Sequence, residues 1–285
     1  MAKLRYLILS NIKLSFFNVS LTLLIFFVID TNINGNNTCN DIISTGNIFI
    51  HPDSVYTIVI DPGHGGKDRG TSFGNVSEKD ITLAISKKIK ERIEKNSNNV
   101  KILLTREEDE FVPLYERIRK ANRARADIFL SIHCNSYPHD RKINGNEVYI
   151  MGLTDSEYNL DIAMRENASV LLEGDYEDNY DWFDPNSIEA HIFLSAFQNL
   201  FLDQSVSLAN KISKNLNKDA NIKSRGVKQA GFVLLKYATM PSILIETGFI
   251  SNSKDRHNLE LPENQNKIAE SIANSIIDYL NHLSS

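Results

Sequence analysis

The feature that most constrains the fold is an alternation of short apolar runs with segments of helical periodicity, which begins near residue 56. Residues 56–60 are rich in β-branched side chains and stop at Asp61-Pro-Gly63, which is typical of a buried strand. Residues 78–95 place isoleucines near helical spacing behind Ser77, and predict an amphipathic helix. Further strands are expected at 100–105, 127–132, 146–151 and 242–246, and 232–235 is expected as a strand or part of a loop. Further helices are expected at 113–125, 187–217 and 262–283. The alternation predicts an α/β fold, a single domain with a mainly parallel twisted sheet flanked by helices.

The N-terminal segment, residues 1–30, is expected to be a signal peptide or a membrane anchor. Three basic residues and no acidic residue precede the apolar stretch 14–29, and this order is typical of a signal peptide. An uncleaved anchor and a buried core helix stay open as alternatives, although the stretch is shorter than the roughly 20 apolar residues that a spanning helix prefers. Residues 31–54 predict a flexible linker, because Asn, Thr, Ser and Gly are frequent in its first part.

Charge and cysteine content exclude several classes of protein. The chain has 31 Lys and Arg against 36 Asp and Glu, so its formal charge of −5 gives no general attraction to nucleic acid. Its two cysteines, Cys39 and Cys134, are too few for a disulfide-stapled scaffold or a four-cysteine zinc site. Any metal site is therefore expected to use His, Asp and Glu.

Three of the expected strands end in side chains that suit metal chemistry. His64 and His133 follow the first and third strands, Glu246 ends a later one, and Glu78 stands where the first helix begins. Because sites in open α/β sheets lie at the carboxyl ends of strands, these side chains are expected to meet in one crevice. Two histidines and one carboxylate form a familiar zinc set that leaves a position for water. Taken singly, the glycine-rich turn around His64 and each strand-end histidine are also compatible with structural roles.

Several sequence blocks carry a resemblance to a known family. They are Asp61-Pro-Gly-His-Gly-Gly-Lys-Asp-Arg-Gly70, Glu78, Leu104-Thr-Arg106, the helix from Leu114 to Asn122, Ser131-Ile-His-Cys-Asn-Ser136 and Ile245-Glu-Thr-Gly-Phe-Ile-Ser-Asn252. Together they resemble the zinc-dependent N-acetylmuramoyl-L-alanine amidases, bacterial peptidoglycan hydrolases of the "amidase 3" type. The resemblance covers about residues 55–283, so a zinc amidase catalytic domain is expected over 55–285.

The resemblance implies a role for each matching residue. His64, Glu78 and His133 would hold Zn²⁺, and Glu246 would be the catalytic glutamate. Glu246 would take a proton from a zinc-activated water and deliver it to the alanine amine as the lactyl–L-alanine amide breaks. The family usually has a small residue at the position of Cys134. Adjacent strand residues point to opposite faces, so Cys134 is expected to pack in the core.

The resemblance also implies a place and a process. The chain would be exported to the periplasm or cell envelope and would act on peptidoglycan in wall turnover or daughter-cell separation. Two alternatives are a catalytically silent wall-binding or regulatory homologue and a zinc peptidase with another substrate. The four intact site residues argue against the first, whereas zinc chemistry is shared with the second.

A long connection separates the second histidine from the final strand. Residues 153–202 exceed the usual loop length in a compact domain, which favours a functional role. Some members of the family carry here a helical insertion that covers the zinc and is displaced by an activator protein, and Glu166-Asn167 and Asp184-Pro-Asn-Ser187 resemble parts of that regulated subgroup. We therefore expect a carboxylate of this segment, Glu189 first and Asp184 second, to block the open zinc position. A solvated acidic loop with a packed helix is the plain alternative.

Overall fold

The computed structural model describes residues 55–174, 176–180, 183–196 and 200–283. All of them belong to one compact unit. The expected signal peptide or anchor over 1–30 and the expected linker over 31–54 lie outside the described residues. Within the described part, no helix is long and apolar enough to cross a membrane.

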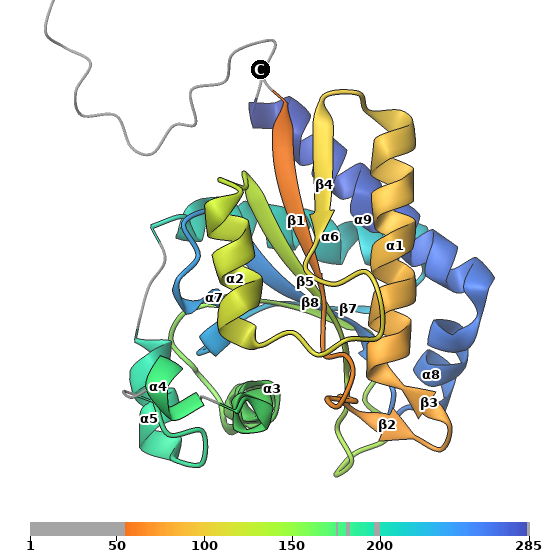
Figure 1. Ribbon diagram of the computed structural model, residues 1–285. Helices are drawn as coiled ribbons and strands as arrows, with labels where there is room; N and C mark the ends of the chain where they lie inside the picture. Colours follow the sequence, from red (N-terminus) through yellow and green to blue (C-terminus); the bar gives the residue numbers. More distant parts are fainter. Residues whose placement is uncertain (1–54, 175, 181–182, 197–199, 284–285) are drawn as a thin grey trace, which may run out of the picture. The chain divides into compact units, whose positions relative to one another are not determined.

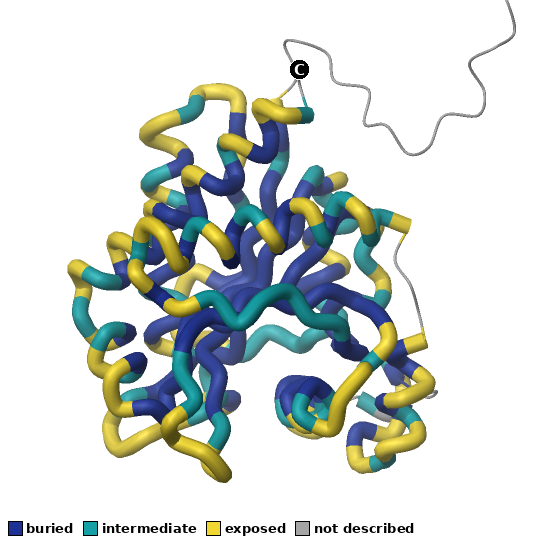
Figure 2. The backbone as a smooth tube through the Cα atoms, turned by 180° about the vertical axis from the view of Figure 1, so that it is seen from behind, coloured by how far each residue is buried: buried dark blue, intermediate teal, exposed yellow. Residues whose placement is uncertain are grey.

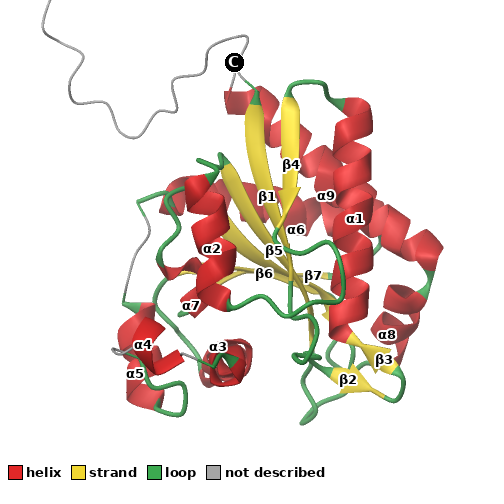
Figure 3. Ribbon diagram, viewed as in Figure 1, coloured by secondary structure: helices red, strands yellow, loops and turns green. Residues whose placement is uncertain are grey.

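A six-stranded sheet forms the centre of the unit (Figures 1 and 3), with the strand order β4-β1-β5-β8-β6-β7. Its strands are β1 (Tyr56–Pro62), β4 (Val100–Leu104), β5 (Ile128–Asn135), β6 (Asn146–Met151), β7 (Ser224–Ala230) and β8 (Ser242–Phe249). The first four in spatial order are parallel, whereas β6 is antiparallel to β8 and parallel to β7. The predicted α/β fold with a mainly parallel sheet is therefore confirmed. A separate two-stranded sheet pairs β2 (Ser72–Phe73) with β3 (Val76–Ser77).

Helices cover both faces of the large sheet (Figure 1). One face packs against α1 (Glu78–Asn96), α6 (Leu202–Asp219) and α9 (Pro262–Leu283), which contribute isoleucines and leucines to one buried cluster. The other face packs against α2 (Leu114–Arg123), α3 (Glu157–Asn167), α5 (Ile188–Ser195) and α7 (Val233–Lys236). The short elements η1 (Ala168–Leu172) and α4 (Tyr176–Asn179) follow α3, and α8 (Ser253–Glu260) precedes α9. Buried positions run along most strands of the large sheet, the edge strand β7 is half-buried, and exposed positions lie on the outer sides of the helices (Figure 2).

The spacing of apolar residues explains the long helices. In α1, Ile81, Ile85, Ile89 and Ile93 follow one another at intervals of four and are at most 5% exposed. A helix places such residues on one stripe, so burying the stripe against the sheet removes apolar surface from water at about 25 cal/mol per Å². The same interval recurs in α9, as expected from its sequence.

Three details differ from the sequence expectation. The helix expected over 187–217 is divided into α5 and α6. The apolar run 232–235, expected as a strand or loop, falls largely in the short helix α7, because a short buried run fits either state by pattern. The edge strand β7 was not expected, since its sequence Ser-Arg-Gly-Val-Lys-Gln-Ala is mostly polar and half-buried.

Candidate active site

The turn after β1 carries His64 and is fixed by two buried arginines. His64 has a left-handed backbone, φ 60°, which costs energy in a residue other than glycine. Arg106 Nε donates to the Pro62 carbonyl at 3.0 Å, and Arg106 Nη2 donates to that of Gly63 at 2.9 Å. Arg117 Nη2 donates to the His64 carbonyl at 2.8 Å. Charge-assisted hydrogen bonds to three successive carbonyls therefore hold this turn in its strained conformation.

Two glycines let the site side chains approach one another. A methyl group on Gly63 would lie 2.5 Å from Nε2 of His133. A methyl group on Gly70, which has φ +61°, would lie 2.5 Å from the His64 ring and 2.7 Å from Oε2 of Glu78. Both distances are shorter than van der Waals contact, so a larger residue at either position would push the histidines or Glu78 aside.

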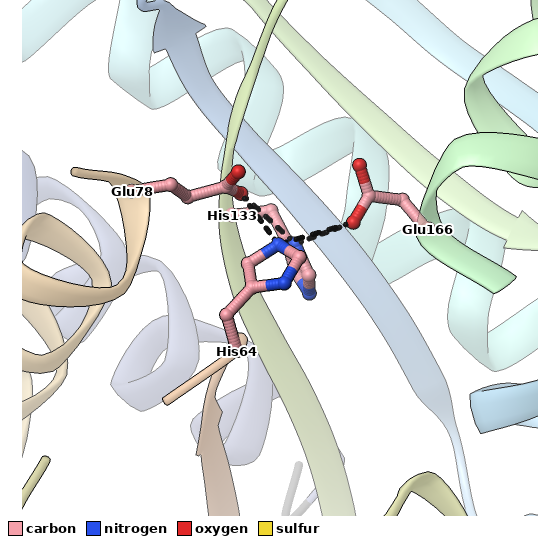
Figure 4. A group of neighbouring side chains, drawn as sticks. All are labelled: His64, Glu78, His133 and Glu166. Carbon is pink, nitrogen blue, oxygen red and sulfur yellow. Dashed lines mark hydrogen bonds and ion pairs between the residues drawn. The ribbon is translucent and has the colours of Figure 1, made fainter. Parts of the chain in front are cut away.

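The structure brings His64, Glu78 and His133 together, as expected, and adds Glu166 from α3 (Figure 4). His64 Nε2 lies 3.2 Å from Glu78 Oε1 and 3.3 Å from Glu166 Oε2. His133 Nδ1 lies 3.1 Å from each of the same two oxygens. Glu78 reaches the histidines from the start of α1, and Glu166 reaches them from the other side. All four residues are buried.

The geometry of the four residues fits a small divalent metal. Their ligand atoms lie within 4.8 Å of one another. A tetrahedral ion with bonds of about 2.0–2.2 Å holds its ligand atoms roughly 3.3 Å apart, close to the distances measured here. Two of the buried atoms, His64 Nε2 and Glu166 Oε2, have no hydrogen bond of suitable geometry within the described residues. Two imidazoles and two carboxylates are also the donor set that zinc accepts in hydrolases.

Electrostatics at the cluster favour positive charge between the carboxylates. Burial alone would lower the pKa of both histidines, but the carboxylates outweigh it. Glu78, Asp68 and Glu166 raise the pKa of His64 well above its ordinary value, and Glu166 and Glu78 raise the pKa of His133 to about 10. Burial alone would raise the pKa of Glu78, but the two histidines outweigh it and lower that pKa to about 2. The site therefore attracts either protons or a metal cation.

Further hydrogen bonds orient these side chains. Asp68 Oδ2 lies 2.9 Å from Nδ1 of His64, which leaves Nε2 directed at the carboxylates. The backbone amide of Cys134 donates to Glu78 Oε1 at 2.9 Å, and that of Thr71 donates to Glu78 Oε2 at 2.8 Å. Partners of this kind fix the tautomer and the direction of metal-binding groups.

Glu246 lies beside the cluster on β8, where its Cα is in register with that of His133 on β5. Its side chain is fully buried, and neither carboxylate oxygen has a hydrogen-bond partner within the described residues. Burial raises the pKa of Glu246 well above its ordinary value, and the nearby Glu166 carboxylate adds to the shift. A buried carboxyl group with a raised pKa suits proton transfer at neutral pH.

Cys134 points away from the cluster. It is fully buried among the apolar residues on the α1 face, and its Sγ lies 3.4 Å from Oγ1 of Thr247. The thiol is free, and burial raises its pKa well above the ordinary value. A neutral thiol in this position packs as a small apolar group.

The carboxylate that approaches the histidines is not one of the two expected from the sequence. Glu189, expected first, is exposed and accepts a hydrogen bond from Ser187 Oγ at 2.9 Å. Asp184, expected second, is exposed and caps the amide of Asn186. Glu166 takes the position because it follows the buried Ile162 by four residues on one face of α3. That helical stripe, together with the resemblance of Glu166-Asn167 to the regulated subgroup, is the signal in the sequence that could have identified it.

Comparison with known proteins adds the family. The family model described as N-acetylmuramoyl-L-alanine amidase, Amidase_3, matches residues 58–278. The amidase AmiC of Escherichia coli O6:H1 is 35% identical over 233 residues, which are 80% of this chain and 53% of that protein. The amidase AmiA of Escherichia coli K12 is 31% identical over 225 residues, which are 78% of this chain and 75% of that protein. The chain thus spans about half of the AmiC relative.

Solved structures show the same architecture. AmiC2 of Nostoc punctiforme is 32% identical with a TM-score of 0.57, over 79% of this chain and 97% of that one. The CwlD amidase of Clostridioides difficile, solved in complex with the GerS lipoprotein, is 26% identical with a TM-score of 0.58, over 80% of this chain and 99% of that one. Both are similar to this chain through nearly the whole described part.

Proposed function

Because the chain belongs to the N-acetylmuramoyl-L-alanine amidase family, we propose that it hydrolyses the amide between the lactyl group of N-acetylmuramic acid and L-alanine in peptidoglycan. The observation that carries the proposal is the buried cluster of His64, Glu78 and His133 at the carboxyl end of the sheet, with Glu246 in register beside it. An amide has a poor leaving group, so its hydrolysis needs both charge stabilisation and proton transfer.

His64, Glu78 and His133 are the residues proposed to hold zinc. When bound, zinc polarises a carbonyl and lowers the pKa of water toward about 7. Asp68 orients His64, and the amides of Thr71 and Cys134 orient Glu78, so the three side chains are fixed before a metal arrives. This rigidity supports a resident cofactor rather than a transient one.

Glu246 is proposed as the general base and then the general acid. Its buried carboxylate, free of hydrogen bonds to described residues, can accept a proton from the attacking water. It can then deliver that proton to the alanine nitrogen as the C–N bond breaks. The products are a lactyl carboxylate on the glycan and a peptide with a free amino terminus.

Glu166 is proposed to keep the resting enzyme inactive. Its Oε2 lies within 3.3 Å of both histidines, where the substrate carbonyl or the attacking water would otherwise bind. Additional contacts hold this end of α3 in place. Arg165 Nη1 donates to the Ser136 carbonyl at 2.5 Å, and Ser169 Oγ donates to Asp68 Oδ2 at 2.7 Å. Activity then requires α3 to move away from the histidines.

An activator protein is the proposed cause of that movement. The helix α5, which contacts α3, exposes Ile188, Ile192 and Phe193 by 50%, 54% and 59%. Large apolar side chains grouped on one exposed helix are typical of a protein-binding surface. A partner that binds α5 and shifts it would pull on α3 and withdraw Glu166.

We also propose that the chain is exported and acts at the cell envelope, in wall turnover or daughter-cell separation. The basic and apolar segments within residues 1–30 support export as a signal peptide or as an anchor. The substrate class supports the same location, because peptidoglycan lies outside the cytoplasmic membrane.

Digestion of purified peptidoglycan by the full chain carrying Glu166→Gln, which removes the proposed block, tests the proposal. The products are identified by mass, with and without a zinc chelator, and the metal content is measured separately. We expect stem peptides that begin with alanine, no products after chelation, and recovery when zinc is restored. Shorter peptides would indicate a peptidase and released sugars a glycosidase. Intact peptidoglycan with a zinc-loaded, folded protein freed of Glu166 would indicate a silent homologue.

A further inference from the structure

A second buried carboxylate, Glu147 on β6, continues the row of site residues across the sheet. Its Cα is in register with Glu246 on β8, which is in register with His133 on β5. Residues paired in this way point to the same face of a sheet, and neighbouring strands lie about 4.8 Å apart. Glu147 therefore lies beyond Glu246, roughly 10 Å from the metal-binding side of the row.

Glu147 holds two cations from the edge strand β7. Arg225 Nε donates to Oε1 of Glu147 at 2.8 Å, and Lys228 Nζ donates to the same oxygen at 2.5 Å. Burial would raise the pKa of Glu147, but Lys228 and Arg225 lower it below its ordinary value, so this carboxylate is charged. No second carboxylate lies within 4.0 Å of either cation among the described residues. Two positive groups against one negative group leave a local charge of +1.

The surplus charge is fixed in position and partly open to solvent. The side chains of Arg225 and Lys228 are 25% and 18% exposed, whereas Glu147 is completely buried. The Arg225 guanidinium lies 5.7 Å from the ring centre of Phe249, and the Lys228 ammonium lies 4.2 Å from that of Tyr158. Cations held by a buried partner and by aromatic rings lose little entropy when they bind an anion.

The helix α3 covers these cations as well as the metal-binding residues. Its Tyr158 hydroxyl donates to both oxygens of Glu147 at 2.9 Å, and its ring lies against Lys228. Eight residues further along the helix, Glu166 reaches His64 and His133. Movement of α3 would therefore open two places together, the metal site and the cationic site beyond Glu246.

We propose that Arg225 and Lys228 bind the free carboxylate of the acidic second residue of the stem peptide. The inference rests on the proposed amidase function. With the scissile nitrogen at Glu246, that carboxylate carbon lies five bonds further along the peptide, about 6 Å in an extended chain. This reach is comparable to the step from one strand to the next. The glycan carries no such charge, so the peptide lies over β6 and β7 and the glycan lies toward β1.

Two muramoyl peptides test this inference. They differ only in whether the second residue bears a carboxylate or a carboxamide, and kcat/KM is measured for each with the zinc-loaded full chain carrying Glu166→Gln, which releases α3 and serves as the parent. We expect kcat/KM to be about tenfold higher for the carboxylate substrate. This factor corresponds to the lower end of the contribution of a hydrogen bond to a charged group. The Lys228→Met variant should lose most of the preference, through a higher KM for the carboxylate substrate. Lys228→Arg should keep it.

The matched control is a lysine on the opposite face of the sheet. Lys211→Met removes a partly exposed cation from α6, remote from the row, and should keep the preference. An equal preference in Lys228→Met and the parent, or no preference in the parent, would overturn the inference while leaving the amidase function intact. The ratio of kcat/KM for the two substrates in the parent still tests the inference if a variant fails to fold. Failure to hydrolyse either substrate after release of α3 would overturn the proposed function and this inference with it.

Discussion

Replacing Glu166 by glutamine tests the proposed resting state most directly. The substitution keeps the shape of the side chain but removes its negative charge. In the structure, Oε2 of Glu166 lies 3.3 Å from His64 Nε2 and 3.1 Å from His133 Nδ1, and Oε1 lies 3.1 Å from Arg165 Nη2. Both carboxylate oxygens of Glu166 thus interact with groups that can carry positive charge, and a neutral amide cannot replace these interactions. We expect Glu166→Gln to raise hydrolysis in the absence of any activator.

The contacts of Glu166 set the size of the effect. Hydrogen bonds to charged groups contribute about 1.5–3 kcal/mol, so losing one such interaction favours the open state by about 10- to 100-fold. While the open state is a small fraction of the population, basal activity rises by the same factor. Contacts that do not involve Glu166 limit the gain. Tyr158 still bonds Glu147, and Ser169 still bonds Asp68.

The assay measures dye release from labelled peptidoglycan by the zinc-loaded full chain without an activator. Metal content and the thermal midpoint are determined on the same samples. Glu189→Gln is the matched control, because Glu189 is an exposed glutamate of the same insertion. An unchanged basal rate in a folded Glu166→Gln variant with full metal content would refute the role of Glu166 in the resting state.

Three further predictions follow from the buried charges. Glu246→Gln should retain zinc by elemental analysis and lose at least about 100-fold in the rate of hydrolysis, which is the usual contribution of a general acid–base group. The control Glu260→Gln, on the exposed side of α8, should change neither the zinc content nor the rate. Arg117→Met leaves Asp61 buried and unpaired, so urea denaturation should show a loss of about 3–5 kcal/mol, against less than about 0.5 kcal/mol for the exposed Arg119→Met. Burial would raise the pKa of Asp61, but Arg117, Thr105 and Ser131 lower it below its ordinary value of 3.8. Its contribution to stability is therefore present above that pH and is lost as the pH falls through the folded-state pKa. Asp61→Asn should flatten the acid limb of stability against pH; an equally steep limb would contradict this.

The sequence could predict the elements whose pattern repeats. The isoleucines of α1 at intervals of four and the β-branched run of β1 each favour one structure strongly, and the strand ends then place His64 and His133 at one edge. The features that could not be predicted, strand β7 and the position of Glu166, depend on contacts between residues far apart in the sequence. Strand β7 is polar because its cations pair with Glu147 on β6, and no local pattern shows that pairing. Glu166 belongs to the buried face of α3, but which acidic residue of a long insertion faces the histidines depends on how that helix docks.

The network through Asn135 has a thermodynamic consequence. Asn135 Nδ2 donates to Glu147 Oε2 at 2.8 Å, and Asn135 Oδ1 accepts from Arg165 at 2.9 Å. Because Tyr158 at the other end of α3 also bonds Glu147, both ends of the helix belong to one hydrogen-bond network. A ligand that competes with α3 for this set, and a partner that withdraws α3, favour the same conformation. Their binding is then linked reciprocally, and each raises the affinity for the other by the same factor. Bound peptidoglycan would thus raise the affinity of the proposed activator for this chain, and their complex would persist longest where uncut wall is abundant.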